Sequence, residues 1–333
     1  MKAIVYREYG SADVLQYEEI EKPVPKDDEV LIKVRAASVN PLDWRLMKGE
    51  PRFLRIFSGL RKPKLGRPGV DVAGDIAAVG SNVADFKPGD EVFGSCNGAF
   101  GEYASATASK LVMKSDDVTF VQAASINVAG LTALQGLRDK GRIRSGSKVL
   151  INGAAGGVGT FAVQIAKSFA AHVTGVCSTR NLDLVRSIGA DEVIDYTQHD
   201  FTTGDQRYDL ILECVGNHSF SECRRVLNPN GRLVGVGAPH DVSVPGLLGG
   251  MIKDLFLSIT GSQKAVMFIA KSSQADLTLL ADMIASGKLN PVIERRYSLS
   301  EAAEAVRHVE EGHARGKVVI EIDVQGPGTN VQS

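Results

Sequence analysis

Long apolar runs and a surplus of charge of either sign are both missing from this sequence of 333 residues. Its most apolar late stretch, 247–260, is broken by Lys253 and Asp254, whereas a membrane-spanning helix needs about 18 successive apolar residues. The formal net charge of -1 provides no long-range field for nucleic acid or an anionic membrane. The first residues resemble a strand rather than a secretory signal. We therefore expect a cytoplasmic protein with no integral membrane segment, no nucleic acid partner and a small-molecule substrate.

Cysteine is scarce as well. The four cysteines are Cys96, Cys177, Cys214 and Cys223. They form no CxxC pair and have no histidine at ligand spacing beside them, which excludes a disulfide framework and fits a reducing compartment. We expect all four to be small apolar residues of the core.

Two patterns divide the chain, and its length favours two domains. Residues 1–122 alternate short apolar runs with Gly, Pro and Asp turns, which is typical of a small β-barrel or sandwich. From residue 123 strands alternate with helices, which predicts parallel strands joined by crossovers. The fold class is therefore α/β, with a β-barrel domain and a doubly wound parallel sheet that binds its ligand at the carboxyl ends of the strands.

The apolar patterns also predict individual elements. Strands are expected at 29–34, 70–79, 91–94, 99–104, 148–151, 172–177, 192–195, 208–214, 232–236 and 317–322. Helices are expected at 183–188, 219–227 and 301–310, with further helical patterns after residue 158 and from residue 277.

A glycine-rich turn follows the strand 148–151 and opens an amphipathic helix. Gly153, Gly156 and Gly159 recur at a spacing of three residues. Without side chains the backbone can approach a pyrophosphate, and Gly159 lets the helix pack closely on the sheet. The start of the helix adds free N–H donors and the positive end of its dipole. The turn therefore predicts a dinucleotide cofactor.

The residues about 20 positions beyond the turn indicate which dinucleotide binds. A site for NAD carries an acid there, on the ribose hydroxyls. This strand instead ends in Cys177, Ser178, Thr179 and Arg180. Hydroxyl donors and a guanidinium suit a 2′-phosphate, so we predict NADPH (NADP+), with Arg180 as a solvated surface charge being the alternative.

Several motifs together resemble the medium-chain dehydrogenase/reductase superfamily, in its zinc-independent quinone oxidoreductase and alkenal reductase branch. Besides the turn, they are SVNPLD at 38–43, GVDVAG at 69–74, AGLTA at 129–133 and GKVV at 316–319. The resemblance implies a GroES-like domain formed by residues 1–122 and 266–333, which includes the final strand. It implies a Rossmann domain over residues 123–265, and we also expect a homodimer.

The resemblance implies a set of cofactor-binding residues. Those expected at the pyrophosphate are Ala155, Gly156, Gly157 and Val158, and those at the 2′-phosphate are Ser178, Arg180 and Tyr196. Asn40, Thr132 and Lys317 align with positions on the nicotinamide side, and Gly237 follows the strand 232–236.

The positions that hold catalytic zinc in alcohol dehydrogenases lack metal ligands here. Zinc needs thiolate or imidazole ligands that converge on one ion. The three regions read Asn40 to Asp43, Val70-Asp71 and Asn127, and Cys96 stands alone where a structural zinc lobe would need four cysteines. We therefore expect no zinc or other metal, and alcohol oxidation loses its usual means of stabilising an alkoxide.

The expected reaction is hydride transfer from NADPH to a quinone or an α,β-unsaturated carbonyl. Such an addition leaves an anion on the acceptor, which a nearby cation stabilises. Arg45 is the candidate, because alkenal-reducing relatives carry a Lys there. A planar guanidinium differs from an ammonium, and Arg45 as a solvated residue on the barrel rim is the alternative.

Two other functions stay open. A zinc-free enoyl-thioester reductase would use the same hydride step, with an acyl pocket lined by the apolar residues between 247 and 256. A non-catalytic member of the family would bind nucleotide or RNA. The segment 52–64 mixes bases with aromatic residues and suits peripheral membrane contact, or else forms a basic loop beside the substrate mouth.

Overall fold

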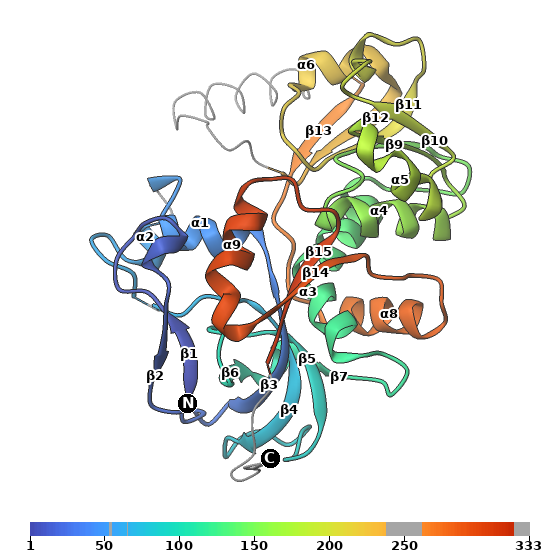
Figure 1. Ribbon diagram of the computed structural model, residues 1–333. Coiled ribbons are helices and arrows are strands. Elements are labelled where there is room, and N and C mark those ends of the chain that lie inside the picture. Colours follow the sequence, from blue (N-terminus) through green and yellow to red (C-terminus); the bar gives the residue numbers. More distant parts are fainter. Residues whose placement is uncertain (53–54, 65, 238–261, 323–333) are drawn as a thin grey trace, which may run out of the picture.

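The structure is a computed structural model that describes residues 1–333 except 53–54, 65, 238–261 and 323–333. Two large sheets lie one above the other, and α3 (Phe120–Gln135) lies between them (Figure 1). The apolar stripe predicted between 247 and 256 is outside the described residues. No helix in the described part of the chain combines the length and the apolar character needed to span a membrane.

Six strands, all paired in parallel, form the upper sheet. In spatial order they are β10 (Glu192–Asp195), β9 (His172–Cys177), β8 (Lys148–Asn152), β11 (Tyr208–Glu213), β12 (Leu227–Gly235) and β13 (Lys264–Met267). The chain proceeds outward from β8 in one direction and from β11 in the other. The order therefore reverses between β8 and β11, and sheets of this kind bind their ligands at the carboxyl ends of the strands beside such a reversal.

Helices cover both faces of this sheet. Successive residues of each strand point to opposite faces, so each strand packs against helices on both sides. Val149 and Ile151 of β8 pack into the same cluster as residues of α3, α4 (Gly157–Ser168), α5 (Leu182–Ser187) and α8 (Gln274–Ala285). Leu150, between them in sequence, packs on the other side with α6 (Phe220–Cys223). The parallel sheet is thus doubly wound, as predicted.

Seven strands form the lower, mixed sheet. They are β14 (Ile293–Ser298), β15 (Lys317–Glu321), β3 (Glu29–Val39), β4 (Asp71–Val79), β5 (Glu91–Ser95) and β7 (Leu111–Met113) in spatial order, with β6 (Tyr103–Thr107) paired to β3. A separate two-stranded antiparallel sheet is formed by β1 (Lys2–Val5) and β2 (Gln16–Glu19). This part of the fold also contains the helices α1 (Pro41–Lys48), α2 (Arg55–Ser58) and α9 (Ala302–Glu310). The final strand β15 pairs with β3, so strands from the first and the last part of the described chain build this sheet.

Four elements differ from their predicted bounds by three residues or more, and one of them is the strand predicted at 232–236, which begins at Leu227 as β12. The strand predicted at 29–34 continues to Val39. The predicted strand is too short because a register shift between Val34 and Ala36 changes which face each residue occupies and interrupts the apolar alternation. The strand predicted at 99–104 lies later, at Tyr103–Thr107. The helix predicted at 219–227 is short, because Leu227 already pairs with Tyr208 as the first residue of β12.

The two boundaries proposed between the domains fall inside elements. Helix α3 begins at Phe120, ahead of residue 123. Strand β13 continues to Met267, past the boundary at 265. The parallel sheet therefore extends two residues further than the sequence pattern indicated.

Candidate cofactor and substrate site

The glycine-rich turn lies between β8 and α4, beside the point where the strand order reverses. Gly153 has φ of +80°, a left-handed conformation that glycine adopts without strain. A Cβ on Gly159 would overlap the carbonyl oxygen of Gly153, so Gly159 packs against the turn itself. Gly157 and Val158 are half-exposed at the start of α4, where their N–H groups have no partner in the preceding turn of helix. An anion can reach this end of the helix.

The residues predicted for the 2′-phosphate lie together. Ser178, Arg180 and Tyr196 line one pocket of about 320 Å³ with Thr179 and His313. They gather there because β9 and β10 are neighbours that end at the same edge of the sheet. The pocket has no carboxylate among its lining residues, which suits an anionic ligand.

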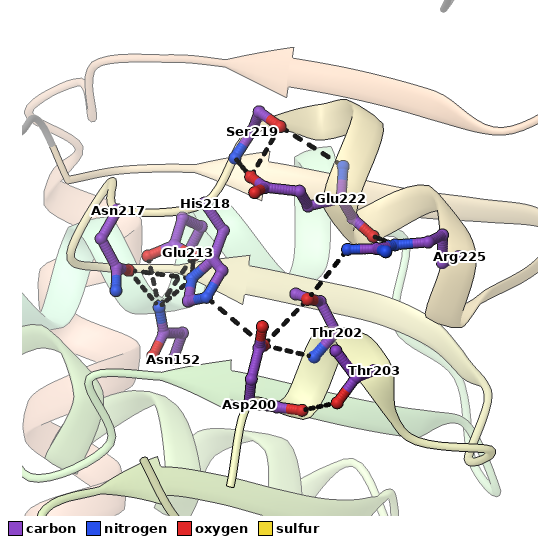
Figure 2. Close-up of polar contacts among 10 residues, drawn as sticks. All are labelled: Asn152, Asp200, Thr202, Thr203, Glu213, Asn217, His218, Ser219, Glu222 and Arg225. Atoms are coloured by element: carbon purple, nitrogen blue, oxygen red, sulfur yellow. Dashed lines mark hydrogen bonds and ion pairs between the residues drawn. The ribbon is translucent and has the colours of Figure 1, made fainter. Parts of the chain in front are cut away.

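Glu213 ends β11 with its carboxylate buried at this edge (Figure 2). Its oxygens accept hydrogen bonds from Asn152 Nδ2 at 2.9 and 2.8 Å and from the N–H groups of Val215 and Gly216 at 2.9 and 2.8 Å. Asn152 is the residue before the glycine-rich turn. The carboxylate therefore joins the ends of β8 and β11 under the predicted cofactor site.

His218 completes this group as a titratable partner. Its Nδ1 lies 3.8 Å from the Glu213 carboxylate and its Nε2 lies 3.7 Å from Asp200 (Figure 2). Its ring packs on Phe201, with the ring centroids 4.6 Å apart. The neighbouring Glu213 carboxylate raises the pKa of the His218 imidazole. Gly237 lies at the same edge, since a Cβ there would overlap the carbonyl of Cys214 just beyond β11.

A second buried carboxylate, Asp71, lies at the start of β4. It accepts hydrogen bonds from Ser38 Oγ at 2.8 Å, from Asn40 Nδ2 at 2.9 Å and from Asn127 Nδ2 at 2.9 Å. The Lys317 ammonium lies 3.8 Å from Asp71 and donates to Asn40 Oδ1 at 2.6 Å. We call Ser38, Asn40, Asp71, Asn127 and Lys317 the Asp71 network. It joins β3, β4, β15 and α3.

Lys317 also contacts the cofactor turn. A Cβ on Gly157 would lie 3.3 Å from Lys317 Cδ, and the N–H of Gly316 donates to the carbonyl of Ala155 at 2.8 Å. The structure thus places two of the residues predicted for the nicotinamide side, Asn40 and Lys317, in one network beside the residues predicted for the pyrophosphate.

The other two candidates on this side are placed less directly. Thr132 is half-exposed on α3, one helical turn beyond Val128, whose N–H donates to Asp71 at 3.2 Å. Arg45 is half-buried on α1 with its guanidinium 4.8 Å above the Trp44 ring, and burial lowers its pKa. Arg45 is therefore not simply a solvated rim residue, and its role toward the substrate stays a prediction.

Sequence reasoning missed three residues of the site. Asp43 caps α1 by accepting the N–H of Asn40 at 2.8 Å, and the Asn-Pro-Leu-Asp spacing was a capping signal for it. Glu213 had a weaker signal, as a single acid that ends an apolar strand. His313 had none, because it reaches the pocket from a segment more than 100 residues away in the sequence.

Comparisons with known proteins agree with this architecture. The alcohol dehydrogenase GroES-like domain matches residues 26–117 and the zinc-binding dehydrogenase family matches residues 188–320. A chloroplast envelope quinone oxidoreductase homolog of Arabidopsis thaliana is 34% identical over 336 residues, covering 96% of this chain and 98% of that protein. The chain belongs to the quinone oxidoreductase branch of the medium-chain dehydrogenase/reductase superfamily.

Further matches place this superfamily member among reductases. The NADPH-dependent alkenal/one oxidoreductase of Arabidopsis thaliana is 34% identical over 335 residues, covering 96% of this chain and 79% of that protein. The solved quinone oxidoreductase of Coxiella burnetii superposes with a TM-score of 0.86 at 30% identity, covering 97% of this chain and 99% of that one. The chain is therefore an oxidoreductase.

In this oxidoreductase, Asn40, Asp71 and Asn127 occupy the regions that the sequence analysis compared with zinc ligands. Their side chains do converge, but the two amide groups direct their N–H donors at the Asp71 carboxylate. An amide N–H has no lone pair for a metal. Among the described residues there is no group of three or more His, Cys, Asp or Glu side chains that could hold a metal ion.

Two further expectations concern surface and cysteine residues of this superfamily member. In the basic segment, Arg55 donates to the Gly49 carbonyl at 3.1 Å and its guanidinium lies 4.4 Å above the Tyr9 ring, so it is part of the fold. Ile56 and Leu60 of the segment are exposed.

All four cysteines are free, and three of them are buried while Cys214 is half-buried.

Proposed function

We propose that this oxidoreductase uses NADPH to reduce quinones or α,β-unsaturated carbonyls. The observation that carries the proposal is the pocket of Ser178, Arg180 and Tyr196 at the edge of the parallel sheet that also holds the glycine-rich turn. Relatives at 34% identity are named for quinones and for alkenals and alkenones, which supports these two substrate classes.

The residues present fit NADPH. The start of α4 offers N–H donors from Gly157 and Val158 beside a turn whose glycines leave room for a pyrophosphate. The guanidinium of Arg180 and the hydroxyl groups of Ser178 and Tyr196 suit the 2′-phosphate. We assign Ala155, Gly156 and Gly237 to the same cofactor path, and Asn40, Thr132 and Lys317 to its nicotinamide end.

When bound, NADPH supplies a hydride to the electron-poor acceptor. The chain's own residues orient the reactants and stabilise charge. Lys317 is held by Asn40 and Asp71, so its cation has a defined position at the nicotinamide end. The acceptor oxygen becomes anionic when a hydride adds to the conjugated system, and donors or cations close to it lower the barrier. We propose Arg45 as the residue that meets this oxygen, and a reaction without zinc.

The test is oxidation of NADPH and NADH against naphthoquinones, short alkenals, enones and an enoyl thioester, with and without a chelator. We expect turnover of quinones or enones, preference for NADPH and no effect of the chelator. Preference for the enoyl thioester would favour the acyl-thioester function instead, and no turnover with any acceptor would favour a binding function. Arg45→Ala should raise KM or lower kcat while the affinity for NADPH is unchanged.

We also propose a homodimer and a cytoplasmic location. Strand β13 is at the edge of the parallel sheet, and Met267 and Ile269 beside it are 61% and 91% exposed, which supports a dimer formed at this edge. Light scattering of the wild type and of Ile269→Lys tests the dimer, because the added charge should shift the measured mass toward that of the monomer.

Free cysteines support the proposed location in a reducing compartment. Flotation with liposomes tests membrane contact by segment 52–64.

A further inference from the structure

One of the five residues that line the pocket predicted for the 2′-phosphate comes from the part of the chain that builds the other sheet. Ser178, Thr179, Arg180 and Tyr196 follow β9 and β10, but His313 belongs to the segment between α9 and β15. The guanidinium of Arg180 donates through Nη2 to the His313 carbonyl at 3.1 Å. This pocket is therefore lined by two residues with N–H-bearing side chains, Arg180 from one domain and His313 from the other.

The residues that follow His313 are held in place by hydrogen bonds. The N–H of Arg315 donates to Glu294 Oε2 at 2.9 Å, and the N–H of Gly316 donates to the Ala155 carbonyl at 2.8 Å. Gly316 has φ of +87°, and a Cβ there would overlap the carbonyl of Val292. One backbone hydrogen bond, one hydrogen bond to a carboxylate and a close approach thus hold the segment within three residues of His313.

The chemistry of this pocket suits an anion. An imidazole carries at least one N–H donor in its neutral form and two in its charged form. The acid beside the pocket, Asp195, is already engaged, because it accepts hydrogen bonds from the hydroxyls of Thr179 at 2.5 Å and Thr197 at 2.8 Å. A phosphate in the pocket would therefore meet donors from Arg180, Ser178 and His313.

We propose that His313 is a ligand of the 2′-phosphate and a determinant of NADPH preference, contributed by the domain that does not hold the rest of the cofactor's adenosine site. The inference rests on the proposed use of NADPH. It follows that a cofactor with this phosphate joins the two domains at His313, and that NADH lacks the contact.

The test compares direct binding of 2′,5′-ADP and 5′-ADP by titration calorimetry, without any turnover. In His313→Ala the backbone carbonyl that receives Arg180 is retained, so the change removes the imidazole alone. We expect 2′,5′-ADP to bind roughly tenfold more weakly, as for loss of one hydrogen bond to a charged group, and 5′-ADP to bind as in the wild type. His313→Lys should restore most of the difference between the two nucleotides.

His199→Ala is the matched control, because His199 is an exposed imidazole near Asp195 that does not line the pocket. It should leave both affinities within about twofold of the wild type. In steady-state assays His313→Ala should raise KM for NADPH at constant kcat, since the hydride-transfer end of the site is untouched.

The outcomes separate the two proposals. If Arg180→Ala weakens 2′,5′-ADP selectively and His313→Ala does not, then His313 is no ligand while the NADPH assignment stands. If neither variant separates 2′,5′-ADP from 5′-ADP, the pocket is not a 2′-phosphate site and both proposals fail. Equal weakening of both nucleotides in His313→Ala would assign the residue a structural role only.

Discussion

The two sheets each bury one carboxylate at the candidate site, and the two acids have different cations as partners. Asp71, in the lower sheet, is fully buried and lies 3.8 Å from Lys317, whose side chain is 3% exposed. Glu213, in the parallel sheet, lies 3.8 Å from His218, whose side chain is 18% exposed. Asp71 also accepts hydrogen bonds from two asparagine amides and one backbone N–H, and Glu213 accepts them from one asparagine amide and two backbone N–H groups.

The two cations differ in how the surrounding protein shifts their pKa. Burial lowers the pKa of Lys317, but the Asp71 and Asp43 carboxylates favour its charged form. The His218 imidazole titrates closer to neutral pH, and Glu213 raises its pKa. The charge of His218, and with it the pair with Glu213, should therefore depend on pH. The Asp71 network lies deeper in the protein and joins four elements, so we expect its main effect on the stability of the fold.

The largest effect is expected for Asp71→Ala. It leaves the Lys317 ammonium buried without its counter-charge, and removal of one partner of a buried pair costs about 3–5 kcal/mol. Urea unfolding should show this loss in free energy of unfolding. The double variant Asp71→Ala with Lys317→Met should recover part of it. A loss of less than about 1 kcal/mol in the single variant would contradict a paired Lys317.

Asp43 is a third buried acid, in the same region as Asp71, and it has no cation in direct contact among the described hydrogen bonds and ion pairs. Burial raises the pKa of Asp43 from 3.8 to about 7. Its contribution to stability is full below the unfolded pKa and is lost as pH rises through about 7. At about 1.4 kcal/mol per pH unit, the loss approaches roughly 4 kcal/mol.

Unfolding measured from pH 4 to 8 in the wild type and Asp43→Asn tests this effect. The amide oxygen can still accept the Asn40 N–H, so the variant should be less sensitive to pH over this range. Parallel curves for the two proteins would show that Asp43 does not titrate as described.

Glu213→Ala should have a smaller effect on stability, about 2–3 kcal/mol, because it leaves two backbone N–H groups without their acceptor and removes one of the acceptors of the Asn152 amide. It should also raise KM for NADPH, since Asn152 precedes the glycine-rich turn. Glu213→Gln keeps one oxygen acceptor and should lose less on both measures. An unchanged KM in Glu213→Ala would separate this carboxylate from the cofactor site.

The smallest effect is expected for His218→Gln, at most about 1 kcal/mol, because the pair is partly open to solvent. With its pKa raised above 6.5, the charged imidazole stabilises the fold fully below that pH. The contribution is lost as pH rises through the raised pKa. The difference in unfolding free energy between wild type and variant should therefore be larger at pH 6 than at pH 9, and a constant difference would refute it.

Much of the parallel sheet could be predicted from the sequence alone. The strands at 172–177 and 192–195 were predicted to the residue, because each is a short apolar run between turns. The glycine-rich turn was equally clear, since φ of Gly153 and the close approach at Gly159 are local requirements. The second part of β3, from Arg35 onward, was not predicted, because a register shift interrupts the apolar pattern there.

The sequence by itself thus determined the order of elements, the cofactor turn and the residues that end β9, because these depend on neighbours within a few positions. Only the tertiary structure placed Asn40 and Asn127 on Asp71, set the Lys317 ammonium against Asn40 and Asp71, and brought His313 to Arg180. Those contacts join residues as far as 277 positions apart. No local periodicity encodes them, because they form only when β15 pairs with β3 and both sheets pack on α3.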